Sequence, residues 1–148
     1  MEGKPGDGAV RQRQDELRRQ ITAVVPADIS RSYPLLSPLE PFDILSSNLC
    51  LGSVSNTVQE FEANVIKLSQ LLKVGGYFVL LVSLERTWAW AGDQKFFLLY
   101  LTSEDVHRSI ENAGLNIVEA HKKKIPDSAG DVYGDCKYME FVIAQKLK

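Results

Sequence analysis

A capped helix, a glycine pair and a continuous apolar run follow one another between residues 57 and 82. Thr57 and Glu60 have the spacing of a capping box, in which a hydroxyl and a carboxylate bind the free N–H groups at a helix start. The helix they predict stops before Gly75-Gly76, where positive φ is easily reached. Residues 77–82 are then apolar throughout, which is typical of a strand buried on both faces. A helix leading into such a strand is the building unit of an α/β fold.

The rest of the chain extends this pattern in both directions. Strands are predicted at residues 42–48, 117–125 and 137–146, a hairpin at 88–101 that turns near Gly92-Asp93, and a second helix capped by Thr102 or Ser103 and closed by Gly114. The order predicts parallel strands joined by helices, followed by an antiparallel pair. We therefore expect an α/β sheet that is mostly parallel and ends in an antiparallel strand pair.

The first forty residues are less regular. Residues 1–9 are rich in glycine and are expected to be loop or disordered, so the domain is expected at residues 10–148. Val10, Gln14, Leu17 and Ile21 follow helical spacing through a charged stretch, which predicts a solvated helix. The run around Val24-Val25 predicts a short strand that ends at Asp28.

Ligands of such sheets bind at the carboxyl ends of the parallel strands. If Val24-Val25 is a strand, this rule places Asp28, Asn48 and residues 83–90 on one edge of the sheet. The sequence therefore predicts that edge as the functional one.

Composition excludes several other classes of protein. The 148 residues are 45% apolar and 24% charged with a net charge of −2, which indicates a soluble domain without a basic surface for nucleic acid or membrane. Cys50 and Cys136 are far apart, which predicts reduced thiols and a cytoplasmic protein. His107 and His121 have no neighbouring ligand residues, so no metal site is expected.

Five segments carry a resemblance to a known family. They are FDILSSNLCL at 42–51, LLKVGG at 71–76, GDQKF at 92–96, ENAGL at 111–115 and AQK at 144–146. In this order they resemble the nicotinamide, phenylethanolamine and indolethylamine N-methyltransferases over nearly the whole chain. The resemblance implies a Rossmann-like methyltransferase sheet, S-adenosylmethionine as cofactor, and methyl transfer to a small amine or pyridine-type nitrogen.

The chain departs from that fold at its start. A cofactor site of this type needs glycines directly after the first strand, but Gly3, Gly6 and Gly8 follow no apolar run. The resemblance therefore implies a truncated C-terminal portion that lacks the N-terminal strands and the glycine loop. Its exposed sheet edges would favour self-association or binding to a full-length relative. The alternative to an enzyme is a non-catalytic remnant or isoform that acts as an interaction module.

The resemblance assigns three residues to the cofactor. Asp28 matches a carboxylate that accepts from the adenine amino group, Ile29 matches the neighbour whose N–H meets the ring, and Asn48 matches a position beside the cofactor. From the residues alone, Asp28 and Asn48 are equally explained as turn residues that follow strands.

The acceptor side is less well defined. Residues 83–90 and the hairpin match the wall of the amine pocket, which makes Ser83, Trp88 and Trp90 candidate substrate contacts, with Asp135 as a candidate amine partner. Glu85 is the one catalytic candidate, although a solvated carboxylate at a strand end explains it as well. The two tryptophans are also explained by packing.

Acidic and tyrosine positions of the family pocket are replaced here. Gly52 stands where members often carry a carboxylate, Val82 or Arg86 stands at the acidic pocket position, depending on the member compared, and Ala89 replaces a pocket tyrosine. The acceptor of a named relative therefore cannot be transferred to this chain.

Overall fold

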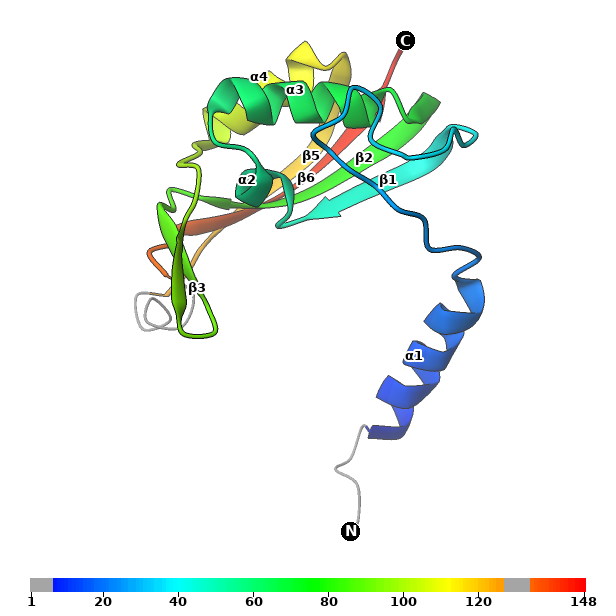
Figure 1. The fold of residues 1–148 in the computed structure, drawn as a ribbon, viewed down its shortest axis with the longest axis horizontal. Coiled ribbons are helices and arrows are strands. Elements are labelled where there is room, and N and C mark those ends of the chain that lie inside the picture. Colours follow the sequence, from blue (N-terminus) through cyan, green and yellow to red (C-terminus); the bar gives the residue numbers. More distant parts are fainter. Residues whose placement is uncertain (1–6, 127–133) are drawn as a thin grey trace.

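The computed structural model describes residues 7–126 and 134–148, which form a sheet flanked by helices and a separate hairpin (Figure 1). The helices are α1 (Asp7–Gln20), α2 (Leu51–Val54), α3 (Val58–Ser69) and α4 (Ser103–Asn112). The strands are β1 (Phe42–Asn48), β2 (Leu72–Leu84), β3 (Trp88–Ala91), β4 (Gln94–Phe97), β5 (Leu115–Lys124) and β6 (Tyr138–Lys146).

The main sheet has the strand order β1-β2-β6-β5. β1 pairs with β2 in parallel, whereas β6 runs antiparallel to both β2 and β5. β1, β2 and β5 therefore run in one direction and β6 in the other, as in the predicted sheet with its antiparallel C-terminal pair. The α/β fold expected from the sequence is confirmed.

Both predicted helix starts are capped. In α3 the Glu60 N–H donates to Thr57 Oγ1 at 3.1 Å, and the Glu60 carboxylate accepts from the Asn56 N–H at 2.7 Å. The carboxylate thus reaches one residue further back than a capping box requires. In α4 the box is complete, because Thr102 and Asp105 each bind the other's backbone N–H.

The core lies between α3, α4 and one face of the sheet. Most of its buried side chains come from these helices and from alternate positions of β2 and β6: Phe61, Val65, Phe78, Leu80, Val82, Leu84, Val106, Ile110, Val142 and Ala144. Leu101 before α4 joins them. The intervening residues of the same strands face the other way and are at most half-buried, Leu81 and Phe141 among them. No helix of the described residues covers that second face (Figure 1).

The glycine pair lies inside β2, where the sequence places a break before the strand. β2 begins at Leu72, five residues before the predicted start, and its register with β1 shifts between Phe42 and Ile44. Gly75 has the positive φ expected of it, at 82°. A Cβ on Gly76 would lie 3.0 Å from the Asp43 carbonyl oxygen. The backbone of β1 therefore lies so close that only glycine fits at this position.

The strand predicted at Val24-Val25 is wrong. Residues 21–41 contain only an isolated bridge between Ala27 and Leu35, and Val24 is 91% exposed. A strand is stable only when a neighbour accepts and donates its backbone hydrogen bonds, and no described strand lies beside this segment. β1 is consequently an edge strand.

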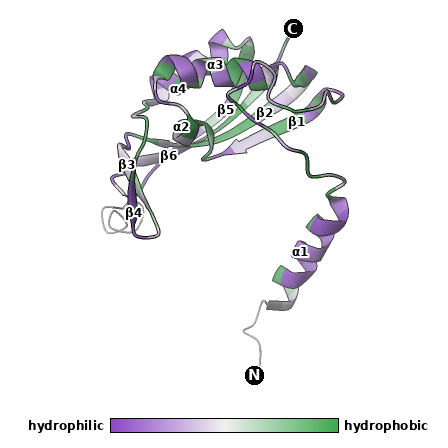
Figure 2. Cartoon of the chain, in the orientation of Figure 1, coloured by the Kyte–Doolittle hydropathy of each residue, from purple (hydrophilic) through white to green (hydrophobic). Residues whose placement is uncertain are grey.

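α1 begins at Asp7, so residues 7–9, expected as loop, belong to the helix, whereas residues 1–6 lie outside the described part. The helix extends away from the sheet (Figure 1) and is mostly hydrophilic (Figure 2). Its apolar residues Val10 and Leu17 are exposed, as expected of the predicted solvated helix. None of the described helices is both long and apolar enough to cross a membrane.

Candidate functional site

A hollow beside the predicted functional edge extends to the carboxyl end of β1. It has a volume of about 610 Å³ and is bounded by the loop of residues 26–36, by β1 and by α2. Leu45, Leu51 and Val54 give it an apolar wall. Asp28, Ile29 and Asn48, the three residues assigned to the cofactor, all line it, although no strand precedes Asp28. The loop thus brings Asp28 to β1 without the predicted strand.

The Asp28 carboxylate is exposed and held by its own turn. It accepts from Ser30 Oγ at 2.7 Å and from the Ser30 N–H at 3.0 Å. These hydrogen bonds are the main reason that the pKa of Asp28 lies below its ordinary value, with a smaller contribution from the positive charge of Arg31. The group is therefore an ionised acceptor at neutral pH. Asp28 therefore stabilises its own turn, as aspartates often do, and also lines the hollow.

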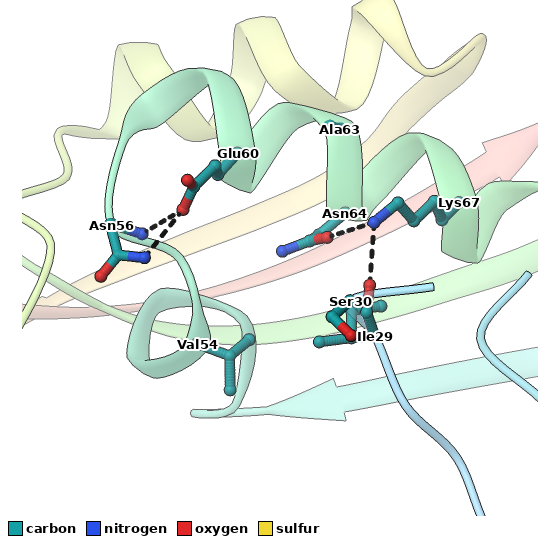
Figure 3. A pocket seen from close by; sticks show the side chains of 8 residues that line it. All are labelled: Ile29, Ser30, Val54, Asn56, Glu60, Ala63, Asn64 and Lys67. Carbon is teal, nitrogen blue, oxygen red and sulfur yellow. Dashed lines mark hydrogen bonds between the residues drawn. The ribbon is translucent and has the colours of Figure 1, made fainter. Parts of the chain in front are cut away.

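Ile29 joins the loop to the core. It is half-buried and packs against the core, and its carbonyl oxygen accepts from Lys67 Nζ on α3 at 2.8 Å. Ile29 also lines a second, smaller hollow of about 340 Å³ between the loop and α3 (Figure 3). The sequence offered no signal for Lys67, because its contact lies 38 residues away along the chain.

Asn48 is the last residue of β1 and is exposed. It pairs with Leu81 of β2, and the following residue, Leu49, has a positive φ of 55°. The chain therefore turns sharply after Asn48 into α2. This turn directs α2 across the end of the sheet, where Leu51 and Val54 close the 610 Å³ hollow.

A third hollow, of about 290 Å³, lies beside the hairpin. Ser53 of α2 lines it together with Arg86, Ala89, Ala91 and residues 96–98. Leu51 and Val54 of the same short helix line the hollow at β1. α2 thus contributes to both hollows, which places the two on adjacent sides of one helical turn.

Trp88 and Trp90 do not line the 290 Å³ hollow. Their rings contact each other edge to face with centroids 5.8 Å apart, and Lys95 Nζ lies 4.2 Å from the Trp88 ring centroid. Since successive side chains of a strand alternate, Ala89 and Ala91 face the hollow and the tryptophans face away. The structure thus brings the two tryptophans together, but on the other face of the hairpin.

Asp135 anchors the start of the hairpin. Its carboxylate accepts from the Thr87 N–H at 2.9 Å, from the Trp88 N–H at 3.1 Å and from the Thr87 hydroxyl. Burial alone would raise the pKa of Asp135, but the bonds from Thr87 and Trp88 outweigh it, so the pKa lies below its ordinary value. The Asp135 carboxylate therefore binds backbone and hydroxyl groups of this chain and holds the start of the hairpin in place.

The other two candidates lie apart from the hollows. Ser83 is half-buried on the uncovered face of β2 and pairs with Met139. Glu85 follows β2 with a positive φ of 51°, and its carboxylate lies 3.6 Å from Lys122 Nζ. Neither residue lines any of these three hollows. Within residues 7–126 and 134–148, no three His, Cys, Asp or Glu side chains gather where they could hold a metal ion.

Comparison with known sequences identifies the family. Residues 1–147 match the NNMT/PNMT/TEMT family. The chain belongs to this family. The resemblance found in its five segments is thereby confirmed.

Two relatives match along most of this chain. It is 30% identical over 137 residues to nicotinamide N-methyltransferase from Sus scrofa, which covers 92% of this chain and 51% of the relative. Phenylethanolamine N-methyltransferase from Sus scrofa is 29% identical over 150 residues, covering 99% of this chain and 52% of the relative. The chain therefore spans about half the length of these family members.

Solved structures support the fold. The N-methyltransferase NodS from Bradyrhizobium japonicum, solved with S-adenosyl-L-homocysteine, matches with a TM-score of 0.59 at 12% identity. The match covers 96% of this chain and 63% of NodS. At this level of identity the likeness concerns the fold, and it places this family member among the S-adenosylmethionine-dependent methyltransferase folds.

Proposed function

We propose that this chain contributes the adenine side of the cofactor site in an S-adenosylmethionine-dependent N-methyltransferase that acts on a small amine or pyridine-type nitrogen. The observation that carries the proposal is the convergence of Asp28, Ile29 and Asn48 on one hollow. These residues come from two segments that share no strand pairing, and the family resemblance assigns all three to the cofactor.

The residues present suit the proposed cofactor. An exocyclic amino group donates hydrogen bonds, and Asp28 supplies an ionised, exposed acceptor for it. Ile29, Leu51 and Val54 supply apolar surface for a ring, and Asn48 supplies a polar group at the end of β1. When bound, S-adenosylmethionine would supply a methyl group on a positively charged sulfur, which an acceptor nitrogen takes by displacement. The chain itself then needs to bind, orient and exclude water, with no nucleophilic side chain of its own.

The acceptor is proposed to bind beside the hairpin. The 290 Å³ hollow lies next to α2, whose other side closes the proposed cofactor hollow, so two ligands could meet across this helical turn. Ser83, Trp88, Trp90 and Asp135 remain proposed acceptor-side residues. The hydrogen bonds of Asp135 favour a role in supporting the hairpin, and the outward direction of the tryptophans favours contacts on its other face. Glu85 remains a candidate without an observed link to a hollow.

Calorimetric titration with S-adenosylhomocysteine tests the proposal directly. Binding with a Kd in the micromolar range, about −8 kcal/mol, together with a rise in Tm that follows from that affinity, is expected. A methylation screen of small amines and pyridines would then identify the acceptor. A wild-type chain that shows neither heat of binding nor a change in Tm contradicts the proposal for this chain.

A second proposal concerns association. The outer edge of β1 has no partner among the described strands, Ile44 on it is 64% exposed, and the sheet face opposite α3 and α4 presents Leu81 and Phe141. Unpaired strand edges and uncovered apolar faces favour pairing with another chain. We propose self-association or binding to a full-length relative through this edge, which would also suit the alternative of an interaction module. Light scattering that shows a monodisperse monomer with a single cooperative melt contradicts it.

A further inference from the structure

A line of hydrogen bonds connects the 26–36 loop to the helices. Lys67 Nζ donates to the Ile29 carbonyl oxygen at 2.8 Å and to Asn64 Oδ1 at 3.2 Å (Figure 3). Asn64 Nδ2 in turn donates to Ser55 Oγ, just after α2, at 3.1 Å. Asn64 is only 6% exposed and uses both ends of its amide in these contacts. Asn64 on α3 therefore holds the Lys67 ammonium in a position from which it donates to the loop.

This contact is important because the other hydrogen bonds of the loop do not reach the rest of the protein. The backbone bonds of the loop, such as Asp28 N–H to the Pro34 carbonyl oxygen at 2.7 Å, are internal to it. Among the residues that the structure describes, the Lys67 bond is the hydrogen bond that joins the 26–36 loop to the rest of the protein. The burial of Pro34 and the packing of Ile29 against the core add apolar contacts, but the hydrophobic effect is non-directional, so these contacts do not orient the peptide groups of the loop.

The bond acts on the same peptide unit that holds Asp28. The carbonyl of Ile29 and the N–H of Ser30 belong to one planar peptide group. Lys67 donates to its oxygen at 2.8 Å, and the Asp28 carboxylate accepts from its N–H at 3.0 Å. Hydrogen bonds on opposite sides of one amide polarise it and strengthen each other. The orientation of the Asp28 carboxylate is thus coupled to Lys67 through a rigid group.

We propose that Lys67 is a positioning residue for the adenine side of the cofactor site, holding the Ile29–Ser30 peptide so that Asp28 and Ile29 face the 610 Å³ hollow. This inference rests on the proposed function for its ligand. Its structural part, the restraint of the loop, does not depend on a ligand. The positive charge of Lys67 also contributes, after Ser30 and Arg31, to the low pKa of Asp28.

Three variants isolate the role of Lys67. Lys67→Met keeps the length of the side chain but removes the donors, Lys67→Arg restores a donor, and Lys73→Met removes an equivalent charge from β2, where Lys73 pairs with Asp43 at 2.8 Å. Amide hydrogen exchange of residues 28–31 is measured first, without ligand. We expect exchange about tenfold faster in Lys67→Met, the usual scale for losing a hydrogen bond to a charged group, with near wild-type exchange in the other two.

The Kd for S-adenosylhomocysteine is the second measurement. A loop that samples other conformations lowers the affinity by the fraction of time it is misplaced, so Lys67→Met should bind about tenfold more weakly while its Tm stays near that of wild type. Lys67→Arg should recover most of this loss. Equal exchange at residues 28–31 in Lys67→Met and wild type would overturn the inference. If the wild type binds no S-adenosylhomocysteine, the proposed function fails, while the exchange data still decide whether Lys67 positions the loop.

Discussion

Two regions of this chain are held by different forces. From Phe42 onward, parallel and antiparallel pairing and a buried core fix the sheet and its helices. Residues 21–41 are held by one isolated bridge, the burial of Pro34, the packing of Ile29 and the Lys67 hydrogen bond. Asp28 and Ile29 belong to the second region and Asn48 to the first. Stability and ligand affinity should therefore respond to different substitutions.

The largest difference between the two regions should appear in core truncations. Phe61 on α3 is fully buried, so Phe61→Ala should lower the free energy of unfolding by about 3–5 kcal/mol. Val24→Ala in the loosely held region should change it by less than about 0.5 kcal/mol, because Val24 is exposed. Urea denaturation of both variants checks this. A similar loss in both would mean that residues 21–41 pack more firmly than their contacts indicate.

Glycine substitutions contrast the sheet region with α1, the exposed helix that precedes residues 21–41. In Gly76→Ala the new Cβ would lie about 3.0 Å from the carbonyl oxygens of Asp43 and Lys73, and the backbone must shift, which costs about 1–3 kcal/mol. A Cβ on Gly8 in α1 would point into open space, so Gly8→Ala should leave the unfolding of the sheet unchanged. Thermal melts of the two variants test the contrast, and an unchanged Tm in Gly76→Ala would argue against the tight approach of β1 to β2.

Two exposed carboxylates, one in the 26–36 loop and one on β1, test whether the affinity for S-adenosylhomocysteine depends on the loop. Asp28→Asn removes the charged acceptor from the hollow and should weaken S-adenosylhomocysteine binding about tenfold, with Tm unchanged. Asp43→Asn on β1 removes an exposed carboxylate that pairs with Lys73 and should leave the Kd unchanged. Calorimetric titration of both variants provides the measurement. Equal affinities would remove Asp28 from the proposed site.

The sequence predicted the sheet region well for a physical reason. Capping at Thr57 and Thr102, the turn at Gly92 and apolar patterning are local signals, and they agree with the tertiary packing there. The predicted strand at Val24-Val25 fails because strand formation depends on a neighbour, which local pattern cannot report. The placement of the glycine pair inside β2 likewise depends on how closely β1 approaches Gly76.

The candidate site was predictable only in part. Asp28, Ile29 and Asn48 were found through resemblance, and the structure brings them to one hollow. Lys67 was missed because its contact with Ile29 joins distant segments and leaves no periodic pattern. The direction of Trp88 and Trp90 depends on the register of the hairpin, which sets the face that each side chain occupies.

Loss of a helix cap should have a smaller effect on the sheet region. Thr102→Ala removes the hydroxyl that accepts from the Asp105 N–H at 3.2 Å, and it should cost about 1 kcal/mol of unfolding free energy. Thr102→Ser keeps the hydroxyl and serves as the control. Chemical denaturation measures both. If the two variants are equally stable, the capping box of α4 does not contribute to stability.

The smallest expected effect is a difference in acid sensitivity between Asp135 and Asp28. Both pKa values lie below the ordinary 3.8, so each carboxylate can stabilise the fold above that pH and lose its contribution as the pH falls. The size of the contribution depends on whether the contact is lost on unfolding. Asp28 bonds to Ser30, two residues away, and such a turn can persist in the unfolded chain.

Asp135 instead bonds to Thr87, 48 residues away, and this contact disappears on unfolding. Between about pH 5 and about pH 3, the wild type should therefore lose unfolding free energy, and Asp135→Asn should lose measurably less. Asp28→Asn should keep the wild-type dependence. Urea denaturation of the three proteins at the two pH values provides the test. If Asp28→Asn flattens the dependence as much as Asp135→Asn does, the 26–36 loop is coupled to global folding as firmly as the hairpin is, and the contrast between the two regions is wrong.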